Sequence, residues 1–193
     1  CANRLYIHEK VYDEFLEKFS NAVSKIKVGD GFDEGVISGP LIDEFSLNKV
    51  KDQVTDAANT GAKIAVGGDV HSLGGNFFQP TVLSEVTTNA KITYEETFGP
   101  VAPLYKFSND EEVIKMANDT PYGLASYFYS RDIGRVWRVA EALEYGIVAV
   151  NNGAPTKAEM PFGGMKESGS GREGSKYGID DFLEIKYISM AGI

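Results

Sequence analysis

The segment YEETFGP, residues 94–100, places two adjacent carboxylates before an aromatic ring and a Gly-Pro turn. In an extended segment, neighbouring side chains point to opposite faces, so one of Glu95 and Glu96 is expected to face a cleft while the other faces solvent. A carboxylate can accept two hydroxyl hydrogen bonds, which suits the ribose of a nucleotide. Charged residues are usually exposed, so a solvated acidic turn is the competing interpretation.

A glycine-rich segment, PFGGMKESGSGREG, occupies residues 161–174. It does not match G-x-x-x-x-G-K-[ST], and Gly169 and Gly171 give only G-x-G before Arg172, so the pattern indicates phosphate binding only weakly. The glycines are better explained by a backbone that approaches another segment closely. Phe162, between a proline and two glycines, either lines a pocket or fills the core.

Potential nucleophiles and metal ligands are few, because Cys1 is the only cysteine and His8 and His71 are the only histidines. Neither histidine stands in a recognisable motif and no G-x-S-x-G segment is present, which argues against a self-contained hydrolase. The two histidines have no ligand spacing, so no metal site is predicted. A single cysteine excludes an intramolecular disulfide framework and is typical of a reducing compartment, which favours a cytoplasmic location.

The composition of the 193 residues is that of an ordinary globular chain, with 42% hydrophobic and 24% charged residues. The 28 acidic and 19 basic residues give a formal net charge of −9, which argues against nucleic acid as a partner. No apolar run reaches the length of a membrane helix, and no secretory signal pattern is present, so no membrane association is expected.

The elements that must position these residues alternate between strand and helix patterns. Strands are expected at residues 3–8, 63–68, 79–86, 101–107, 124–130 and 147–151. Helices are expected at residues 11–27, 108–118 and 132–146, and another where Leu47, Val50, Val54 and Ala57 form an apolar stripe. Ser108 and Glu111 form an S-x-x-E capping box at the start of the helix 108–118, and Asp132 is expected to cap the helix 132–146. This alternation predicts an α/β fold with a largely parallel sheet flanked by helices, and ligands are expected at the carboxyl ends of its strands. The apolar strand 147–151 is expected to be buried on both faces.

The C-terminal part has a different pattern. Residues 153–178 are rich in glycine, and the following DDFLEIKYISM returns to an extended pattern. A terminal strand after a long loop has no evident place in the main sheet, so we expect it to pair with another subunit by strand addition. This predicts a homo-oligomer, a dimer or tetramer, held by residues 179–193, with residues 1–178 forming the preceding domain.

Six segments in this order resemble the C-terminal half of the aldehyde dehydrogenases, and within that family most closely the succinate-semialdehyde dehydrogenases. They are CANRLYIHEKVYDEFLEKF, VGDGFDEGVISGPLID, GGNFFQPTVL, YEETFGPVAPLYKF, NDTPYGLASYFYSRD and MPFGGMKESGSGREGSKYGIDDFLEIKY. They are spread along nearly the whole chain, from residue 1 to residue 187.

The resemblance implies a mechanism and a cofactor. In such enzymes a cysteine thiolate attacks an aldehyde, hydride passes to NAD or NADP, and a glutamate base activates the water that hydrolyses the resulting thioester. The implied substrate is a small aldehyde, most closely succinate semialdehyde, oxidised to succinate. Another semialdehyde or an aliphatic aldehyde is the alternative substrate.

The resemblance also assigns roles to residues of this chain. Glu96 corresponds to the residue that hydrogen-bonds the nicotinamide ribose, Phe98 to the aromatic ring beside it, and Lys49 to a cofactor contact in some members. Phe162 corresponds to an aromatic wall of the substrate pocket. At the substrate's distal carboxylate, Thr156 takes the place of a serine and Lys157 is a departure that could bind a carboxylate as a point charge.

By the same resemblance, the reacting groups lie upstream of this chain. The nucleophilic cysteine is expected two residues before Cys1, so Cys1 is the second cysteine of the family's C-x-C, either a redox partner of the nucleophile or a small buried residue. The glutamate base and the NAD(P)-binding domain are expected further upstream. The chain by itself is therefore expected to be inactive. A stand-alone, non-catalytic α/β module used for binding or assembly remains a second interpretation.

Overall fold

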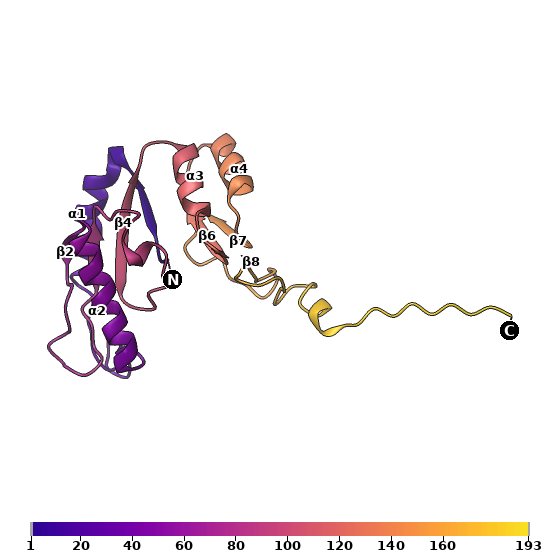
Figure 1. The fold of residues 1–193 in the computed structure, drawn as a ribbon, viewed down its shortest axis with the longest axis horizontal. Helices are drawn as coiled ribbons and strands as arrows, with labels where there is room; N and C mark the ends of the chain where they lie inside the picture. The colour runs from indigo at the N-terminus through magenta and orange to yellow at the C-terminus, as the bar shows by residue number, and fades with distance from the viewer. Residues whose placement is uncertain (1, 193) are drawn as a thin grey trace. The chain divides into compact units, whose positions relative to one another are not determined.

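The computed structural model describes residues 2–192 of the chain (Figure 1). Its contacts divide the chain into two compact units, residues 1–113 and residues 114–193. Within the described part, no helix is long and apolar enough to cross a membrane.

The first unit alternates strands and helices much as the sequence predicts. Its elements in chain order are β1 (Leu5–His8), η1 (Glu9–Val11), α1 (Tyr12–Val23), α2 (Glu44–Asn59), β2 (Lys63–Val66), β3 (Thr81–Ser84), η2 (Lys91–Thr93), β4 (Val101–Phe107) and the start of α3 (Asp110–Asn118). The last helix continues into the second unit.

The four strands of the first unit form one mixed sheet in the order β1-β4-β3-β2. Strand β4 runs parallel to both β1 and β3, whereas β2 pairs antiparallel with β3. The expectation of a largely parallel sheet therefore holds for three strands and fails at one edge. The reason is local, because no helix lies between β2 and β3, and a connection without a helical crossover suits an antiparallel pair.

Helix α1 packs against β1, β2 and β3 with the apolar stripe that the sequence predicts. Tyr12 and Val23 of this helix form a buried cluster with Val82 of β3 and Leu104 of β4. The helix ends at Val23, earlier than expected, but Ile26 beyond its end still packs against the same cluster.

Helix α2 buries the predicted stripe of Leu47, Val50, Val54 and Ala57. It also buries Gln53 completely, with an exposed fraction of 0%. The apolar pattern gave no indication of this, because a glutamine beside an apolar stripe is usually exposed.

The expected capping box before α3 is displaced by one residue. The Asn109 side chain accepts a hydrogen bond from the Glu112 N–H at 2.9 Å, and Glu112 accepts from the Ser108 N–H at 2.8 Å. Asn109 therefore caps the helix, and Glu112 takes the reciprocal role expected of Glu111. Asparagine is as good an N-cap as serine, so the sequence motif alone was ambiguous.

The second unit is built around two short parallel strands and a helix. Its elements are β5 (Tyr122–Gly123), β6 (Ala125–Phe128), α4 (Ile133–Ala142), β7 (Ile147–Val150), β8 (Met165–Lys166) and η3 (Asp180–Phe182). Strand β6 pairs parallel with β7, and β5 pairs antiparallel with β8. Asp132 caps α4 as predicted, since its Oδ1 accepts a hydrogen bond from the Arg135 N–H at 3.0 Å.

Burial in this unit is lower than the sequence predicts. In β7, Ile147 and Ala149 are buried, but the alternate residues are only half-buried, so the strand is not covered on both faces. Helix α4 packs against β7. It turns Val139 inward and leaves Ile133 and Trp137 exposed at 71% and 64%.

The glycine-rich loop brings backbone segments into direct contact, as expected. An ideal Cβ on Gly146 would overlap the carbonyl oxygen of Gly163, and one on Gly163 would overlap the carbonyl oxygen of Gly171. The Arg172 guanidinium donates to the carbonyl oxygens of Gly164 and Gly171, both at 2.8 Å. The loop's other cation, Lys166, donates to the carbonyl oxygens of Asn118 and Thr120. Both cations of the loop are therefore engaged by protein groups, which supports a structural role over phosphate binding.

The C-terminal segment does not form a strand in the described structure. Helix η3 takes up residues 180–182, and residues 183–192 carry no helix or strand. Figure 1 shows this segment running out as a single extended chain, in yellow. Its large apolar side chains are exposed: Phe182, Leu183, Ile185, Tyr187, Ile188 and Met190.

The contact between Gly146 and Gly163 predicts a strong effect of a single methyl group. In the full-length protein, Gly146→Ala should lower the free energy of unfolding by about 2 kcal/mol or more, because two backbone segments must separate to admit the Cβ. Gly153→Ala is the matched control, since an ideal Cβ there meets only the Tyr129 hydroxyl at 3.6 Å. Thermal unfolding measures both, and equal melting temperatures for the two variants would contradict this account.

Candidate functional site

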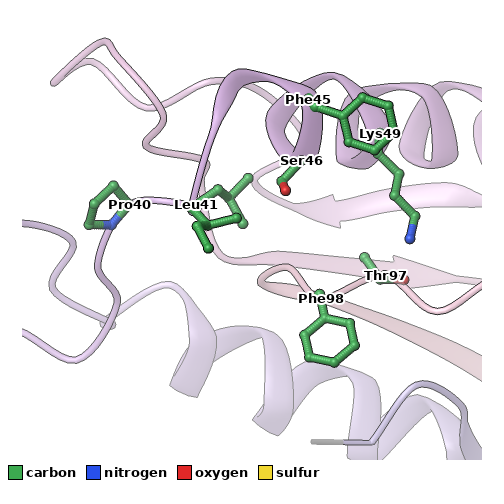
Figure 2. Close-up of a pocket in the computed structure, with 8 residues that line it drawn as sticks. Pro40, Leu41, Phe45, Ser46, Lys49, Thr97 and Phe98 are labelled. Carbon is green, nitrogen blue, oxygen red and sulfur yellow. The ribbon is translucent and has the colours of Figure 1, made fainter.

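A hollow in the first unit gathers residues from two distant parts of the chain. It has a volume of about 460 Å³ and combines the start of α2 with the turn before β4 (Figure 2). It is lined by Pro40, Leu41, Ile42, Phe45, Ser46, Lys49, Thr97 and Phe98. Lys49 and Phe98, two of the three residues predicted to bind a cofactor, thus line one hollow.

The first turns of α2 form one wall of this hollow. The Asp43 side chain caps the helix, since its Oδ1 accepts a hydrogen bond from the Ser46 N–H at 2.7 Å, and this bond lowers the pKa of the Asp43 carboxyl. Phe45 and Lys49 are four residues apart and so share one face of the helix. In Figure 2 the Lys49 side chain extends from α2 towards the level of Thr97.

The turn at residues 94–100 forms the other wall. It was expected to be extended, but η2 ends at Thr93 and the chain then turns, leaving both Glu95 and Glu96 exposed. The two carboxylates still differ, because Glu95 accepts a hydrogen bond from the Gln53 amide at 3.2 Å. Within the described residues, Glu96 makes no side-chain hydrogen bond or ion pair and remains available.

Phe98 is held in an unusual backbone conformation at the rim. Its φ is +45°, in the left-handed region that non-glycine residues seldom adopt, and its ring is 74% exposed. Gly99 follows, and an ideal Cβ there would lie 2.5 Å from Val50 Cγ2 of α2. The close approach of turn and helix therefore requires glycine at this position, and it fixes where the Phe98 ring is presented.

The turn is also anchored to strand β4. The Thr93 and Tyr105 hydroxyls are 2.9 Å apart and share a hydrogen bond. Burial raises the pKa of Tyr105 to about 12, so this phenol stays protonated at physiological pH. The turn is thus fixed from the β4 side as well as from α2.

The chemistry offered by this hollow is binding rather than reaction. Its lining supplies two exposed phenyl rings, an ammonium group and hydroxyls, and no thiol, imidazole or carboxylate. Thr97 Oγ1 is buried and has no hydrogen-bond partner within the described residues. Together with the exposed Glu96, which directly precedes Thr97 in the chain, these groups suit a polar ligand that carries hydroxyls, a planar ring and negative charge.

Sequence reasoning missed six lining residues: Pro40, Leu41, Ile42, Phe45, Ser46 and Thr97. The signal for Phe45 was its position one helical turn before Lys49, behind an evident Asp43 cap. Leu41 and Ile42 carried no signal, because an apolar residue in a loop reads as core or surface equally well.

The residues predicted to bind substrate lie in the second unit. Phe162 is half-buried, and its N–H and carbonyl group both pair with the Glu173 backbone, at 2.9 and 2.6 Å. Thr156 and Lys157 are exposed in a segment without helix or strand. None of the three lines the hollow of the first unit. Cys1 lies outside the described residues.

The second unit has a hollow of its own, of about 530 Å³, lined by Tyr129, Ser130, Arg131 and Asn151. These residues follow the carboxyl ends of the parallel strands β6 and β7. The Asn151 amide accepts from the Ser130 N–H at 2.9 Å and donates to the Ser130 carbonyl oxygen at 2.8 Å, joining the two strand ends. Ligands are expected at the carboxyl ends of parallel strands, so the sequence predicts a site at this edge, but it indicates none of these four residues.

No group of three or more potential metal ligands occurs among the residues that the structure describes. This concerns residues 2–192 only. The donors of the first hollow are hydroxyls and an ammonium group, which are poor ligands for transition metals.

Comparison with known proteins places the chain in a family. Residues 1–188 match the sequence model of the aldehyde dehydrogenase family. The chain is 58% identical, over 188 residues, to a succinate-semialdehyde dehydrogenase (NADP+) from Escherichia coli, covering 97% of this chain and 39% of that protein. It is 54% identical over 193 residues to a glutarate-semialdehyde dehydrogenase from Pseudomonas aeruginosa, covering 100% of this chain and 40% of that protein.

Solved structures give the same result for the fold. A crystal structure of succinate-semialdehyde dehydrogenase from Burkholderia pseudomallei matches with a TM-score of 0.95 and 55% identity, covering 97% of this chain and 39% of that one. The chain thus spans about 39% of the length of the relatives that it matches. Sequence and structure agree that this chain belongs to the aldehyde dehydrogenase family.

Proposed function

We propose that the chain is the C-terminal, catalytic and oligomerisation part of an NAD(P)-dependent dehydrogenase that oxidises succinate semialdehyde to succinate. The observation that carries this proposal is the hollow that brings Lys49 and Phe98 together, with Glu96 two residues before Phe98 in the same turn. These three positions are those that the family resemblance assigns to cofactor binding. The 58% identity to a succinate-semialdehyde dehydrogenase supports the substrate.

The residues of the hollow fit a nicotinamide dinucleotide. Glu96 would accept hydrogen bonds from ribose hydroxyls, the exposed Phe98 ring would pack beside the ribose and nicotinamide, and Lys49 would supply positive charge. The Thr97 hydroxyl at the same wall is buried and makes no hydrogen bond within the described residues. When bound, the nicotinamide supplies a hydride acceptor. The choice between NAD and NADP belongs to the nucleotide-binding domain outside this chain.

The reacting groups of the proposed enzyme lie before residue 1. A cysteine two positions upstream of Cys1 would attack the aldehyde carbon as a thiolate, and a glutamate further upstream would activate water against the acyl thioester. Cys1 would then be a neighbour of the nucleophile, and a possible disulfide partner for it. On this proposal, residues 1–193 bind and position ligands but do not turn over substrate.

Residues of the second unit would shape the substrate site. Phe162 would form an apolar wall, and the Thr156 hydroxyl and Lys157 ammonium would meet the distal carboxylate. A relative named for glutarate semialdehyde, one methylene longer, is 54% identical. One methylene changes specificity by only about 10–200-fold, so a different semialdehyde is the second candidate substrate.

The C-terminal segment would join subunits into a homo-oligomer, a dimer or tetramer. The run of exposed apolar side chains from Phe182 to Met190 supports this, because such a series in a soluble chain calls for a partner to cover it. The alternating pattern of DDFLEIKYISM suits strand addition to a sheet edge.

The cofactor assignment predicts a selective effect of Glu96→Gln in the full-length enzyme. The KM for NAD(P)+ should rise about tenfold with the aldehyde KM nearly unchanged, because a carboxylate accepts ribose hydrogen bonds more strongly than an amide does. Glu111→Gln on α3 is the control for loss of one exposed carboxylate. Steady-state kinetics with each substrate varied in turn would oppose the assignment if both variants matched the wild type.

The enzyme assignment predicts a sharp dependence on one thiol. The full-length gene product should reduce NAD(P)+ with succinate semialdehyde, and replacing the cysteine two positions before Cys1 by alanine should reduce kcat by about 10³-fold or more. Cys1→Ala should keep most of the activity. Absorbance of the reduced nicotinamide measures both.

Three further results of that assay are decisive. Robust turnover by residues 1–193 alone would contradict the proposal that the reacting groups lie before residue 1. A kcat/KM no higher for succinate semialdehyde than for an uncharged aldehyde of similar length would leave the aldehyde dehydrogenase activity but refute the carboxylated substrate. Absence of any NAD(P)+ reduction by the full-length product would favour the non-catalytic module.

The oligomer assignment predicts a change of mass. Deleting residues 183–193 from the full-length protein should convert the oligomer to monomers, because the subunits lose the added strand and its apolar cover. Light scattering measures the mass directly. A deletion variant that keeps the mass of the intact protein would show that the subunits are held elsewhere.

A further inference from the structure

Gln53 is the buried polar residue of α2 that contacts the turn at residues 94–100. Its exposed fraction is 0%, and its Nε2 donates to Glu95 Oε2 at 3.2 Å. It lies one helical turn after Lys49, so the two side chains share a face of the helix. Lys49 in one turn of α2 thus lines the hollow, and Gln53 in the next turn is hydrogen-bonded to the segment that forms the opposite wall.

The bond between Gln53 and Glu95 belongs to a series of contacts between α2 and residues 91–99, which comprise η2 and most of the turn. At one end, Asp56 Oδ2 accepts from the Lys91 N–H at 2.7 Å, and Asp52 Oδ2 lies 2.8 Å from Lys91 Nζ. Both partners of the Lys91–Asp52 ion pair are exposed, and exposed ion pairs contribute little. Of the polar contacts in this series, Gln53–Glu95 is the one whose side-chain donor belongs to a fully buried residue, and its acceptor is the charged Glu95 carboxylate.

The turn that follows needs to be held in place. Phe98 has a φ of +45°, and such a conformation in a non-glycine residue persists only where the surroundings impose it. Glu95 directly precedes Glu96 in the same turn. Fixing the Glu95 side chain to a helix therefore restricts the backbone that presents both Glu96 and Phe98.

We propose that Gln53, acting through Glu95, is a positioning residue that sets where Glu96 and Phe98 lie relative to Lys49 in the dinucleotide site. This inference rests on the proposed cofactor role of the hollow. Gln53 touches no ligand in this scheme. Its effect is to hold the two walls at the spacing that the bound dinucleotide needs.

Because Gln53 is buried, replacing it can distinguish an effect on the geometry of the site from an effect on the stability of the fold. Its Oε1 is buried and makes no hydrogen bond within the described residues. An apolar side chain of similar volume removes that unfavourable burial, while the exposed Glu95 carboxylate can be hydrated by solvent. Gln53→Leu should therefore leave the melting temperature unchanged or raise it. A merely structural glutamine predicts the opposite.

The test is steady-state kinetics on the full-length enzyme. Gln53→Leu should raise the KM for NAD(P)+ about fivefold, while kcat and the aldehyde KM stay within about twofold of wild type. Glu95→Ala should give the same rise, and Glu95→Gln should restore most of the wild-type value, because an amide oxygen still accepts from Gln53 Nε2. Asp52→Asn is the control that removes only the exposed Lys91 ion pair, and it should change neither KM by more than about twofold.

A double-mutant cycle shows whether the two residues act together. The variant with both Gln53→Leu and Glu95→Ala should raise the KM for NAD(P)+ no further than the larger single change. If the two increases in the KM for NAD(P)+ multiply in the double variant, the inference is wrong. It is also wrong if Gln53→Leu leaves that KM unchanged. If Gln53→Leu fails to fold, Glu95→Ala and Glu95→Gln, at an exposed position, decide the matter alone.

The outcome also separates this inference from the function on which it rests. If Glu96→Gln raises the cofactor KM and Gln53→Leu does not, the dinucleotide site stands and the positioning role falls. If neither variant changes the cofactor KM, the hollow is not the dinucleotide site, and both proposals fail together with the cofactor assignment.

Discussion

The close approach of α2 to the turn before β4 is the constraint on which the candidate site depends. Val50 packs where a Cβ of Gly99 would be, and Gln53 reaches Glu95 across the same contact. Because the helix also carries Lys49, one helix–turn contact sets the distance between the two walls of the hollow. Neither wall forms the hollow alone, since the start of α2 lines one side and the turn lines the other.

The second unit relies on a different physical device. There the chain is held by backbone against backbone, with Gly146 against Gly163 and Arg172 donating to carbonyl oxygens of its own loop. Few large side chains are buried in this unit, and Trp137 and the segment after η3 remain exposed. A loop shaped by glycine contacts has a defined path without a large core, which suits the role proposed for Phe162 and its neighbours in shaping a substrate site.

The division between binding and reacting groups explains how the chain relates to its relatives. It belongs to the aldehyde dehydrogenase family but spans about 39% of the length of the relatives compared here. The described residues supply rings, hydroxyls and a cation at the first hollow, whereas a reaction at an aldehyde carbon needs a nucleophile and a base. The proposed enzyme therefore combines this chain's positioning surfaces with groups carried by another part of the polypeptide.

The sequence by itself determined the order and type of the main elements, the apolar stripes of α1 and α2, the Asp132 cap and the family, because each is carried by local periodicity, capping chemistry or collinear motifs. It could not determine that β2 pairs antiparallel at the edge of the sheet, that Gln53 is buried or that Trp137 is exposed. Nor could it determine that residues 94–100 form a turn in which Glu95, but not Glu96, is hydrogen-bonded to α2. These depend on which segments pack together, and residues such as Val50 and Gly99 are far apart in the chain. The residues of the site could be named from sequence, but only the packing of α2 on the turn decided that Lys49 and Phe98 line one hollow.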